Sequence, residues 1–191
     1  MSFLPDNYEK PVSQSNFMRL EQGENRFRIL SSAIVGWIDW KREGEKNTPV
    51  RTKDRQPNLN TDRQSRHFWA FVVWDYRDHK VKILEITQTT IQDAIYSLHA
   101  NQDWGDPKNY DLIVKKTGEK METVYNVIPV PPKKADQRIF DEYSKTKIDL
   151  NKLYSGENPF LDEATTDRGT QDLSKSYPSS EDDIQVKDIP F

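Results

Sequence analysis

The sequence predicts a small all-β domain with a single helix between its strands, followed by a helical extension and an acidic tail. Five segments rich in β-branched and aromatic residues are typical of strands, at residues 25–40, 67–76, 80–87, 110–115 and 123–129. Between the third and fourth of these, Thr90 can cap a helix in which apolar residues recur at helical spacing, namely Ile91, Ala94, Ile95 and Leu98. Because no strand is regularly followed by a helix, an α/β sheet is disfavoured.

Composition restricts the kinds of protein this can be. The 191 residues carry a formal net charge of −3 and have a mean hydropathy of −0.92, which predicts a soluble chain of single-domain size without a membrane span. The absence of cysteine excludes disulfides, cysteine-ligated metal sites and a thiol nucleophile. Residues 1–10 contain no apolar run of the secretory kind, so we expect a cytoplasmic protein.

The individual segments predict how the strands connect. The segment 25–40 reads as one long strand, bent or bulged near Gly36. Segments 67–76 and 80–87 should form a hairpin around a short turn. Residues 41–66 between these strands contain almost nothing apolar and read as a long loop, of a length that is usually functional or disordered.

Five strands with a helix between the third and fourth have the chain order of the OB-fold, a partly open barrel that binds oligonucleotides. A generic α+β domain is the alternative. The complete division of the chain is an N-terminal arm, an OB domain, a helical extension and a disordered acidic tail, at residues 1–19, 20–130, 131–154 and 155–191. The tail is rich in Pro, Ser, Thr and Asp and has too few apolar residues to order itself.

Charge is distributed unevenly along the chain. Residues 154–191 contain three basic and nine acidic residues, whereas residues 1–153 carry a net charge of +3. Residues 41–66 contain eight basic and four acidic residues, next to strands that carry Trp37, Trp40, Trp69 and Phe71. The low overall pI therefore hides a cationic region suited to a polyanion.

Interleaved cations and aromatic rings are what single-stranded nucleic acid requires, because bases stack on rings while phosphates pair with cations. The candidate DNA-binding residues are Arg26, Arg28, Trp37, Trp40, Lys41, Arg42, Arg51, Lys53, Arg55, Arg63, Arg66, Trp69, Phe71, Lys80 and Lys82. We expect Trp69 and Phe71 to point outward, since alternation along the strand places them on the same face as the polar His67. Two alternatives stay open. Strand aromatics are often core residues, and a cationic loop can be a solvated insertion.

Arg26 and Arg28 alternate with apolar residues on a strand, so they are either ligand contacts or ordinary edge charges. No nucleotide-hydrolysing, dinucleotide-binding or hydrolase motif occurs, and the three histidines lack metal-ligand spacing. We therefore expect a non-enzymatic protein without a cofactor or a bound metal.

The chain ends in acidic residues followed by Asp-Ile-Pro-Phe, which resembles the C-terminal tip of bacterial single-stranded DNA-binding proteins. In that family the tip docks onto replication and repair enzymes. This resemblance implies a partner-binding role for Asp182, Asp183, Asp188, Ile189, Pro190 and Phe191. An α-carboxylate and a phenyl ring fit an apolar pocket with a basic rim, and the upstream acids steer the encounter.

The body resembles the single-stranded DNA-binding proteins of tailed bacteriophages, at residues 23–30, 36–37, 67–73, 84–88, 104–107 and 110–111. The resemblance implies an OB-fold that binds single-stranded DNA in phage replication and recombination, and an acidic tail that contacts partners. If a phage encodes the chain, the expected location is the cytoplasm of the host cell. A family member with a structural zinc uses cysteine ligands, which this chain lacks, so zinc is not implied.

The function expected from the sequence is sequence-tolerant binding of single-stranded DNA, with replication and repair proteins as partners of the tail and weak self-association through the arm or the helix around Phe140. One alternative is an RNA-binding OB module, which would need contacts to the 2′-hydroxyl. Another is an adaptor whose basic loop binds an acidic protein.

Overall fold

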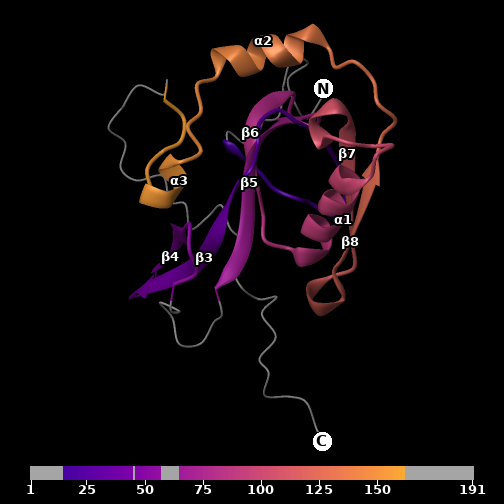
Figure 1. Ribbon diagram of the computed structural model, residues 1–191. Helices are drawn as coiled ribbons and strands as arrows, with labels where there is room; N and C mark the ends of the chain where they lie inside the picture. The colour runs from indigo at the N-terminus through magenta and orange to yellow at the C-terminus, as the bar shows by residue number, and fades with distance from the viewer. Residues whose placement is uncertain (1–14, 45, 57–64, 162–191) are drawn as a thin grey trace, which may run out of the picture.

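The computed structural model describes residues 15–44, 46–56 and 65–161, and in this part of the chain strands predominate (Figure 1). The strands are β1 (Phe17–Met18), β2 (Gly23–Ile29), β3 (Ile34–Glu43), β4 (Lys46–Thr52), β5 (Arg66–Asp75), β6 (Lys80–Ile86), β7 (Asp111–Thr117) and β8 (Val124–Pro129). The helices are α1 (Thr89–Ala100), α2 (Gln137–Lys145) and α3 (Lys152–Ser155), with short 3-10 turns η1 (Pro107–Asn109) and η2 (Lys120–Glu122). The prediction of a mainly β protein with a helix after the third long segment is confirmed.

The first long segment forms two strands instead of one. β2 and β3 both run antiparallel to β5 along the same edge, and residues 30–33 interrupt them. At the interruption, the Leu30 amide donates to the Val72 carbonyl at 2.9 Å, and the Ser31 hydroxyl accepts from the Val72 amide at 2.9 Å. The predicted bend therefore lies before Gly36, because a serine hydroxyl replaces the backbone partner there.

The region predicted as a long loop contains β4, which pairs with β3 in an antiparallel hairpin. β3 contacts β5 only through residues 34–38, whereas its residues 39–43 pair with β4 alone. The far half of the hairpin therefore projects from the sheet (Figure 1). Polar side chains concealed this strand, because a position that it buries is taken by Arg51, whose charge is paired with Glu85, instead of by an apolar residue.

The central strands have Greek-key order. β2, β5 and β6 are neighbours in that sequence, and β7 returns after α1 to pair with β2, which gives the spatial order β7-β2-β5-β6. β8 extends the sheet beyond β7, and β1 pairs parallel with β6 at the other end. Among the described residues no pairing joins these two ends, so the sheet is open there, and the predicted five-stranded OB barrel is not confirmed. Helix α1 packs against β8 instead.

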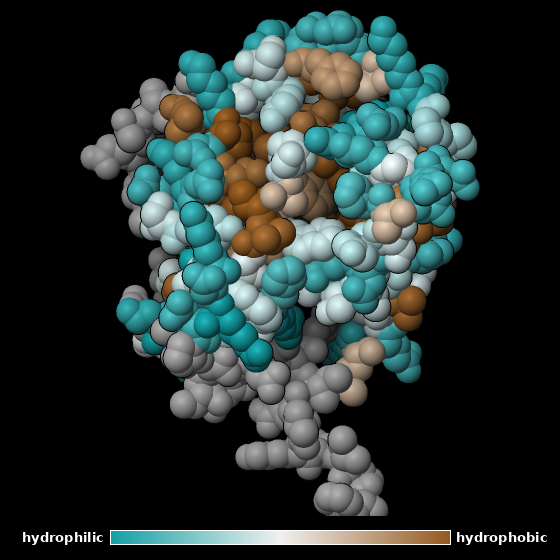
Figure 2. Space-filling view, in the orientation of Figure 1, coloured by the Kyte–Doolittle hydropathy of each residue, from teal (hydrophilic) through white to brown (hydrophobic). Residues whose placement is uncertain are grey.

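Both faces of β5 are buried, in two separate cores. Phe71 and Val73 lie in the first core, with side chains of β2, β7 and α1. Phe68 and Val72 lie in the second, which the C-terminal extension covers with Leu150, Leu153 and Phe160. On the face shown in Figure 2, apolar side chains gather at the centre over β5 and hydrophilic side chains surround them.

The expectation that Trp69 and Phe71 point outward is wrong for Phe71, which is 2 % exposed. Trp69 is partly buried and packs against the first core. Alternation could not reveal this, because a strand covered on both faces is apolar at every position.

The C-terminal extension begins with α2, whose first turn is capped by the Asp136 carboxylate accepting from the Arg138 amide at 3.0 Å. Ordered chain continues past the boundary predicted for the tail. Phe160 is 9 % exposed and forms a β-bridge with Ile148, and the Leu161 amide donates to the Lys147 carbonyl at 2.9 Å. Residues 155–161 are therefore part of the folded domain. None of the helices in the described residues has the length and apolar character needed to cross a membrane.

Candidate nucleic-acid interface

A ring pair stands where β3 and β5 run beside each other. Trp37 and His67 are directly opposite in the antiparallel register, and their ring centroids are 5.3 Å apart in an edge-to-face arrangement. The guanidinium of Arg55, which follows β4, lies 5.0 Å from the centroid of the Trp37 ring. Both rings are partly exposed. Two flat groups and a cation therefore meet at one place on the surface.

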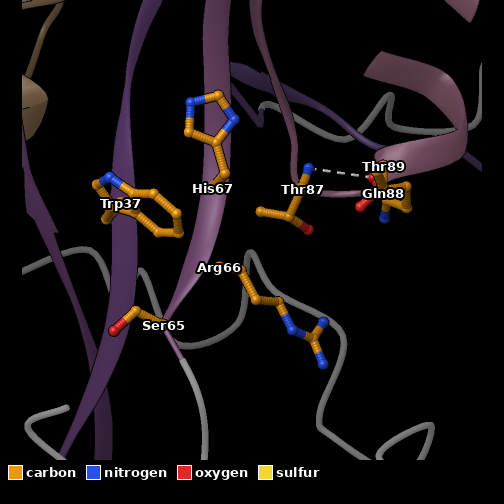
Figure 3. Close-up of a pocket in the computed structure, with 7 residues that line it drawn as sticks. All are labelled: Trp37, Ser65, Arg66, His67, Thr87, Gln88 and Thr89. Atoms are coloured by element: carbon orange, nitrogen blue, oxygen red, sulfur yellow. Dashed lines mark hydrogen bonds between the residues drawn. The ribbon is translucent and has the colours of Figure 1, made fainter. Parts of the chain in front are cut away.

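The ring pair forms one side of an open pocket of about 500 Å³, lined by Trp37, Ser65, Arg66, His67, Thr87, Gln88 and Thr89. Thr87, Gln88 and Thr89, from the end of β6 and the start of α1, lie on the other side (Figure 3). The pocket is polar on this second side, and Arg66 adds a positive charge at its edge. A planar, polar, negatively charged ligand fits such a site.

The buried side chain of Gln92 holds the walls of the pocket together. Its amide nitrogen donates to the His67 carbonyl at 3.1 Å and to the Ile86 carbonyl at 2.9 Å. Gln92 lies on the first turn of α1, and it thereby ties this helix to the ends of β5 and β6. Because a buried amide must be hydrogen-bonded, this arrangement resists rearrangement.

Several of the predicted cations are exposed near the pocket or on the hairpin arm. These are Lys41, Arg42, Lys53, Arg55 and Arg66; Lys80 is also exposed but lies at the other end of β6, opposite Asp75. Lys41 and Arg42 are on the part of β3 that pairs only with β4, and Trp40 beside them is partly buried. The structure thus brings Trp37, Arg55 and Arg66 to one region, places Lys53 over the ring of Tyr154, and places Lys41 and Arg42 on the projecting arm. Arg63 lies outside the described residues.

Three predicted phosphate contacts are buried in ion pairs instead. Arg51 pairs with Glu85 at 2.6 Å, Arg28 pairs with Asp111, and Lys82 pairs with Asp75 and Asp78. Each of these cations is 4 % exposed, so none can reach a phosphate without breaking a buried pair. The sequence could not show this, because the partners of Arg28 and Arg51 are remote in the chain.

The Glu85 carboxyl has a raised pKa because burial disfavours its charge, an effect that the neighbouring Arg51 opposes. Removing either member of such a pair would leave a buried charge without compensation. This pair connects β4 to β6 and so helps to fix the hairpin that carries Arg55.

Arg26, in the middle of β2, has a different environment. Its side chain is 47 % exposed; its Nε donates to Asp111 at 3.0 Å, and its guanidinium lies 4.7 Å from the centroid of the Tyr76 ring. The Tyr76 hydroxyl donates to the same carboxylate at 3.1 Å. Burial and Asp111 raise the pKa of Tyr76, so this hydroxyl remains a donor.

A second pocket, of about 400 Å³, opens beside this network. Arg28 lies at its floor and donates to the Lys108 carbonyl at 3.3 Å and the Lys133 carbonyl at 2.9 Å. Lys134 and the 44 % exposed Phe140 also line it. Sequence reasoning missed these lysines, although the Lys133-Lys134 pair after two prolines was a visible signal.

The first pocket also contains residues that sequence reasoning did not select. In the sequence His67 is only a histidine without metal-ligand spacing, and no motif marks Thr87, Gln88 and Thr89 as the polar side of a pocket. Only the pairing of β3 with β5 places His67 against Trp37. The predicted partner-binding residues of the C-terminal tip, Asp182, Asp183, Asp188, Ile189, Pro190 and Phe191, lie outside the described residues.

Comparison with known proteins adds one relative. The sequence is similar to a protein of Escherichia phage T5 that is named a probable ssDNA-binding protein, with 23% identity over 179 aligned residues. The alignment covers 79% of this chain and 67% of that protein. No family model matches the sequence, and no solved structure matches it significantly. The similarity covers most of this chain, so it is not confined to a single motif.

Proposed function

We propose that this protein binds single-stranded DNA with little regard to sequence, and that its role is binding and not catalysis. The observation that carries the proposal is Arg55 over the Trp37 ring, beside His67, at an open pocket. The name of the phage T5 protein to which the chain is similar supports the same ligand. The Greek-key order of the strands is compatible with an opened OB-fold, which we propose as the fold family.

Magnitudes favour displacement of Arg55 by a base. An exposed cation–π contact contributes about 0.5–1 kcal/mol, whereas stacking of a base on an aromatic ring contributes about 1–3 kcal/mol. A base therefore replaces the guanidinium on the Trp37 ring. The released guanidinium remains beside the base and pairs with the phosphate of the same or the next nucleotide.

The surroundings of the ring favour single strands over duplex. In a duplex the faces of the bases are covered by their neighbours, so Trp37 has nothing to stack on. Arg66 at the pocket edge and the cations of the hairpin arm, Lys41 and Arg42, supply charges for the phosphates on either side. Charge pairing of this kind does not read the sequence of bases.

The wider role that we propose is protection and organisation of single-stranded DNA during phage replication and recombination, with the C-terminal tip recruiting partner proteins. Its support is the resemblance of the terminal residues 182–191 to the bacterial tip and the similarity to the phage T5 protein. The competing RNA-binding and adaptor functions are distinguished by the experiment below.

The test is a titration of the full chain with oligo-dT, followed by tryptophan fluorescence. Stacking on Trp37 predicts strong quenching, and Trp37→Leu should weaken binding by about fivefold to a hundredfold. The matched control is Trp104→Phe, because Trp104 packs on Tyr110, with ring centroids 5.3 Å apart, and does not line the pocket. This control should bind as the wild type does.

Oligo-rU of the same length and a hairpin duplex complete the titration. Preference for rU would indicate an RNA-binding function, since only RNA offers the 2′-hydroxyl. If none of the three nucleic acids binds or quenches the fluorescence, the proposal is refuted, and the alternative of an adaptor that binds an acidic protein is favoured.

A further inference from the structure

Tyr154, in the short helix α3, contacts β3 immediately before Trp37. Its hydroxyl donates a hydrogen bond of 2.7 Å to the Val35 carbonyl, and its ring packs against Phe68 with the centroids 6.2 Å apart. A Cβ atom on Gly36 would lie 3.2 Å from the Tyr154 ring. The C-terminal extension is therefore packed directly on the backbone that leads to the candidate base-stacking ring.

The same ring also contacts a candidate phosphate-binding cation. The Nζ of Lys53, the first residue after β4, lies 5.5 Å from the centroid of the Tyr154 ring. Arg55 makes the corresponding contact with Trp37 at 5.0 Å. The segment that follows β4 thus places one cation on each of two aromatic rings.

These two rings lie on opposite faces of β3. Successive side chains of a strand alternate between its faces, so Gly36 shares a face with Tyr154 and Trp37 points to the other. Lys53 and Arg55 therefore flank the same short stretch of β3 from its two sides. A strand of DNA that stacks a base on Trp37 would have to cross this stretch for its phosphates to meet both cations.

We propose that Tyr154 is a positioning residue of the interface, which holds Lys53 in place to contact a phosphate adjacent to the base stacked on Trp37. This inference rests on the proposed function and deepens it. A free lysine side chain loses conformational entropy when it binds a phosphate. The Tyr154 ring attracts the ammonium group of the exposed Lys53 before DNA binds and so restricts this side chain beforehand, which reduces the entropy lost on binding.

The competing explanation is that Tyr154 only stabilises the fold through Phe68. The two explanations differ in the salt dependence of binding. The salt slope is the slope of the logarithm of the binding constant against the logarithm of the salt concentration, and it counts neutralised phosphates but does not report stability. Each phosphate contact contributes about 0.7 to the logarithmic salt slope for a single strand.

The experiment is a double-mutant cycle on the full chain with oligo-dT as the probe and circular dichroism to confirm folding. Lys53→Gln should reduce the slope by about 0.7 and weaken binding at low salt about two- to fivefold. Tyr154→Leu should cause the same loss of slope, and the double variant should show no further loss. Tyr154→Phe keeps the ring and should keep the wild-type slope.

If Tyr154→Leu does not fold, a variant with a ring of almost unchanged shape replaces it in the experiment. Replacement of Tyr154 by 3,4,5-trifluorophenylalanine removes most of the negative electrostatic potential at the face of the ring, which attracts the ammonium group. Tyr154→Phe is its matched control. The fluorinated ring should reduce the slope as Lys53→Gln does. A wild-type slope for every folded variant at Tyr154, or additive losses in the cycle, would overturn the inference.

These outcomes are separate from failure of the proposed function. If the wild-type chain does not bind oligo-dT, single-stranded DNA binding itself is wrong, and the inference about Tyr154 fails with it. If the wild type binds and Lys53→Gln reduces the slope while the folded Tyr154 variants do not, only the positioning role is refuted.

Discussion

The Arg55 guanidinium lies 5.0 Å from the centroid of the Trp37 ring. Trp37 is on β3 and Arg55 follows β4, so the β3–β4 hairpin brings the cation back over the ring. The contact keeps a charged group and a stacking surface together before any ligand arrives. A nucleotide offers both a base and a phosphate, so it can satisfy both groups at once.

Replacement of this cation should change the salt dependence of binding. Arg55→Gln removes one phosphate contact, so the logarithmic salt slope for oligo-dT should fall by about 0.7. The control is Lys115→Gln, which removes an exposed charge on β7. Fluorescence titrations between low and moderate salt measure both slopes. Equal slopes for Arg55→Gln and the wild type would show that Arg55 does not reach a phosphate.

Gly36 should not tolerate a side chain. A Cβ atom at this position would lie 2.3 Å from the Thr52 carbonyl oxygen and 3.1 Å from the Phe68 ring. Because the oxygen belongs to the backbone of β4, the hairpin would have to shift, and Gly36→Ala should cost about 1–3 kcal/mol in the free energy of unfolding. Denaturant titration measures this loss, and the displaced hairpin should also weaken DNA binding.

Gly44→Ala is the comparison for Gly36→Ala. Gly44 has a φ of 64° but nothing within 4 Å of an added Cβ, so its substitution costs only the backbone strain of about 1–2 kcal/mol. It should leave the Trp37 site in place and DNA binding close to that of the wild type. A larger loss of binding for Gly44→Ala than for Gly36→Ala would contradict the steric argument.

Glu85 should make stability depend on pH. Its folded-state pKa is raised, chiefly by burial, so the folded state binds this proton more tightly than the unfolded state does. The resulting contribution to stability is complete below the ordinary pKa of a glutamate and is lost as the pH rises through the raised value. Glu85→Gln cannot titrate. The free energy of unfolding of the wild type, relative to this variant, should therefore fall as the pH rises.

Denaturant midpoints of both proteins across the acidic to neutral range test the Glu85 prediction. Glu24→Gln, at an exposed position of β2, is the control and should follow the wild type. A constant difference between wild type and Glu85→Gln across this range would show that burial does not raise the pKa of Glu85.

Removal of residues 162–191 should strengthen binding of single-stranded DNA at low salt. This segment contains eight acidic and three basic residues, so we expect it to compete with phosphates for the cations of the body. The gain should disappear at high salt, where the Debye length falls to about 3 Å at 1 M. Truncation also tests partner docking, which we expect to be lost with the tip.

The shortened chain must still contain all residues up to Leu161, because Phe160 packs in the second core. A matched variant that replaces the acidic residues of 162–191 by their amides keeps the length of the chain and removes its charge. If both variants bind oligo-dT with wild-type affinity at low ionic strength, competition by the tail is wrong.

Much of the strand content was readable from the sequence, since β5, β6, β7 and β8 begin and end close to the predicted residues. β4 was missed because its side chains are mostly polar. The break between β2 and β3 was misplaced because a serine hydroxyl, and not the glycine, replaces a backbone hydrogen-bond partner there. Trp37, Arg55 and Arg66 were identified as candidates, whereas His67 and Tyr154 were not.

By itself, the sequence determined which chemistry this protein can offer: aromatic rings and cations close together in the chain, an acidic terminal segment and no cysteine. The alternation of apolar and polar residues and the distribution of charge depend only on the order of residues, so the sequence shows them directly. The tertiary structure decided which of those groups are usable, because burial depends on what packs from elsewhere in the chain. Arg51 and Arg55 have the same charge and are close in the chain. Arg51 is buried in an ion pair with Glu85, whereas Arg55 lies at the surface over the ring of Trp37.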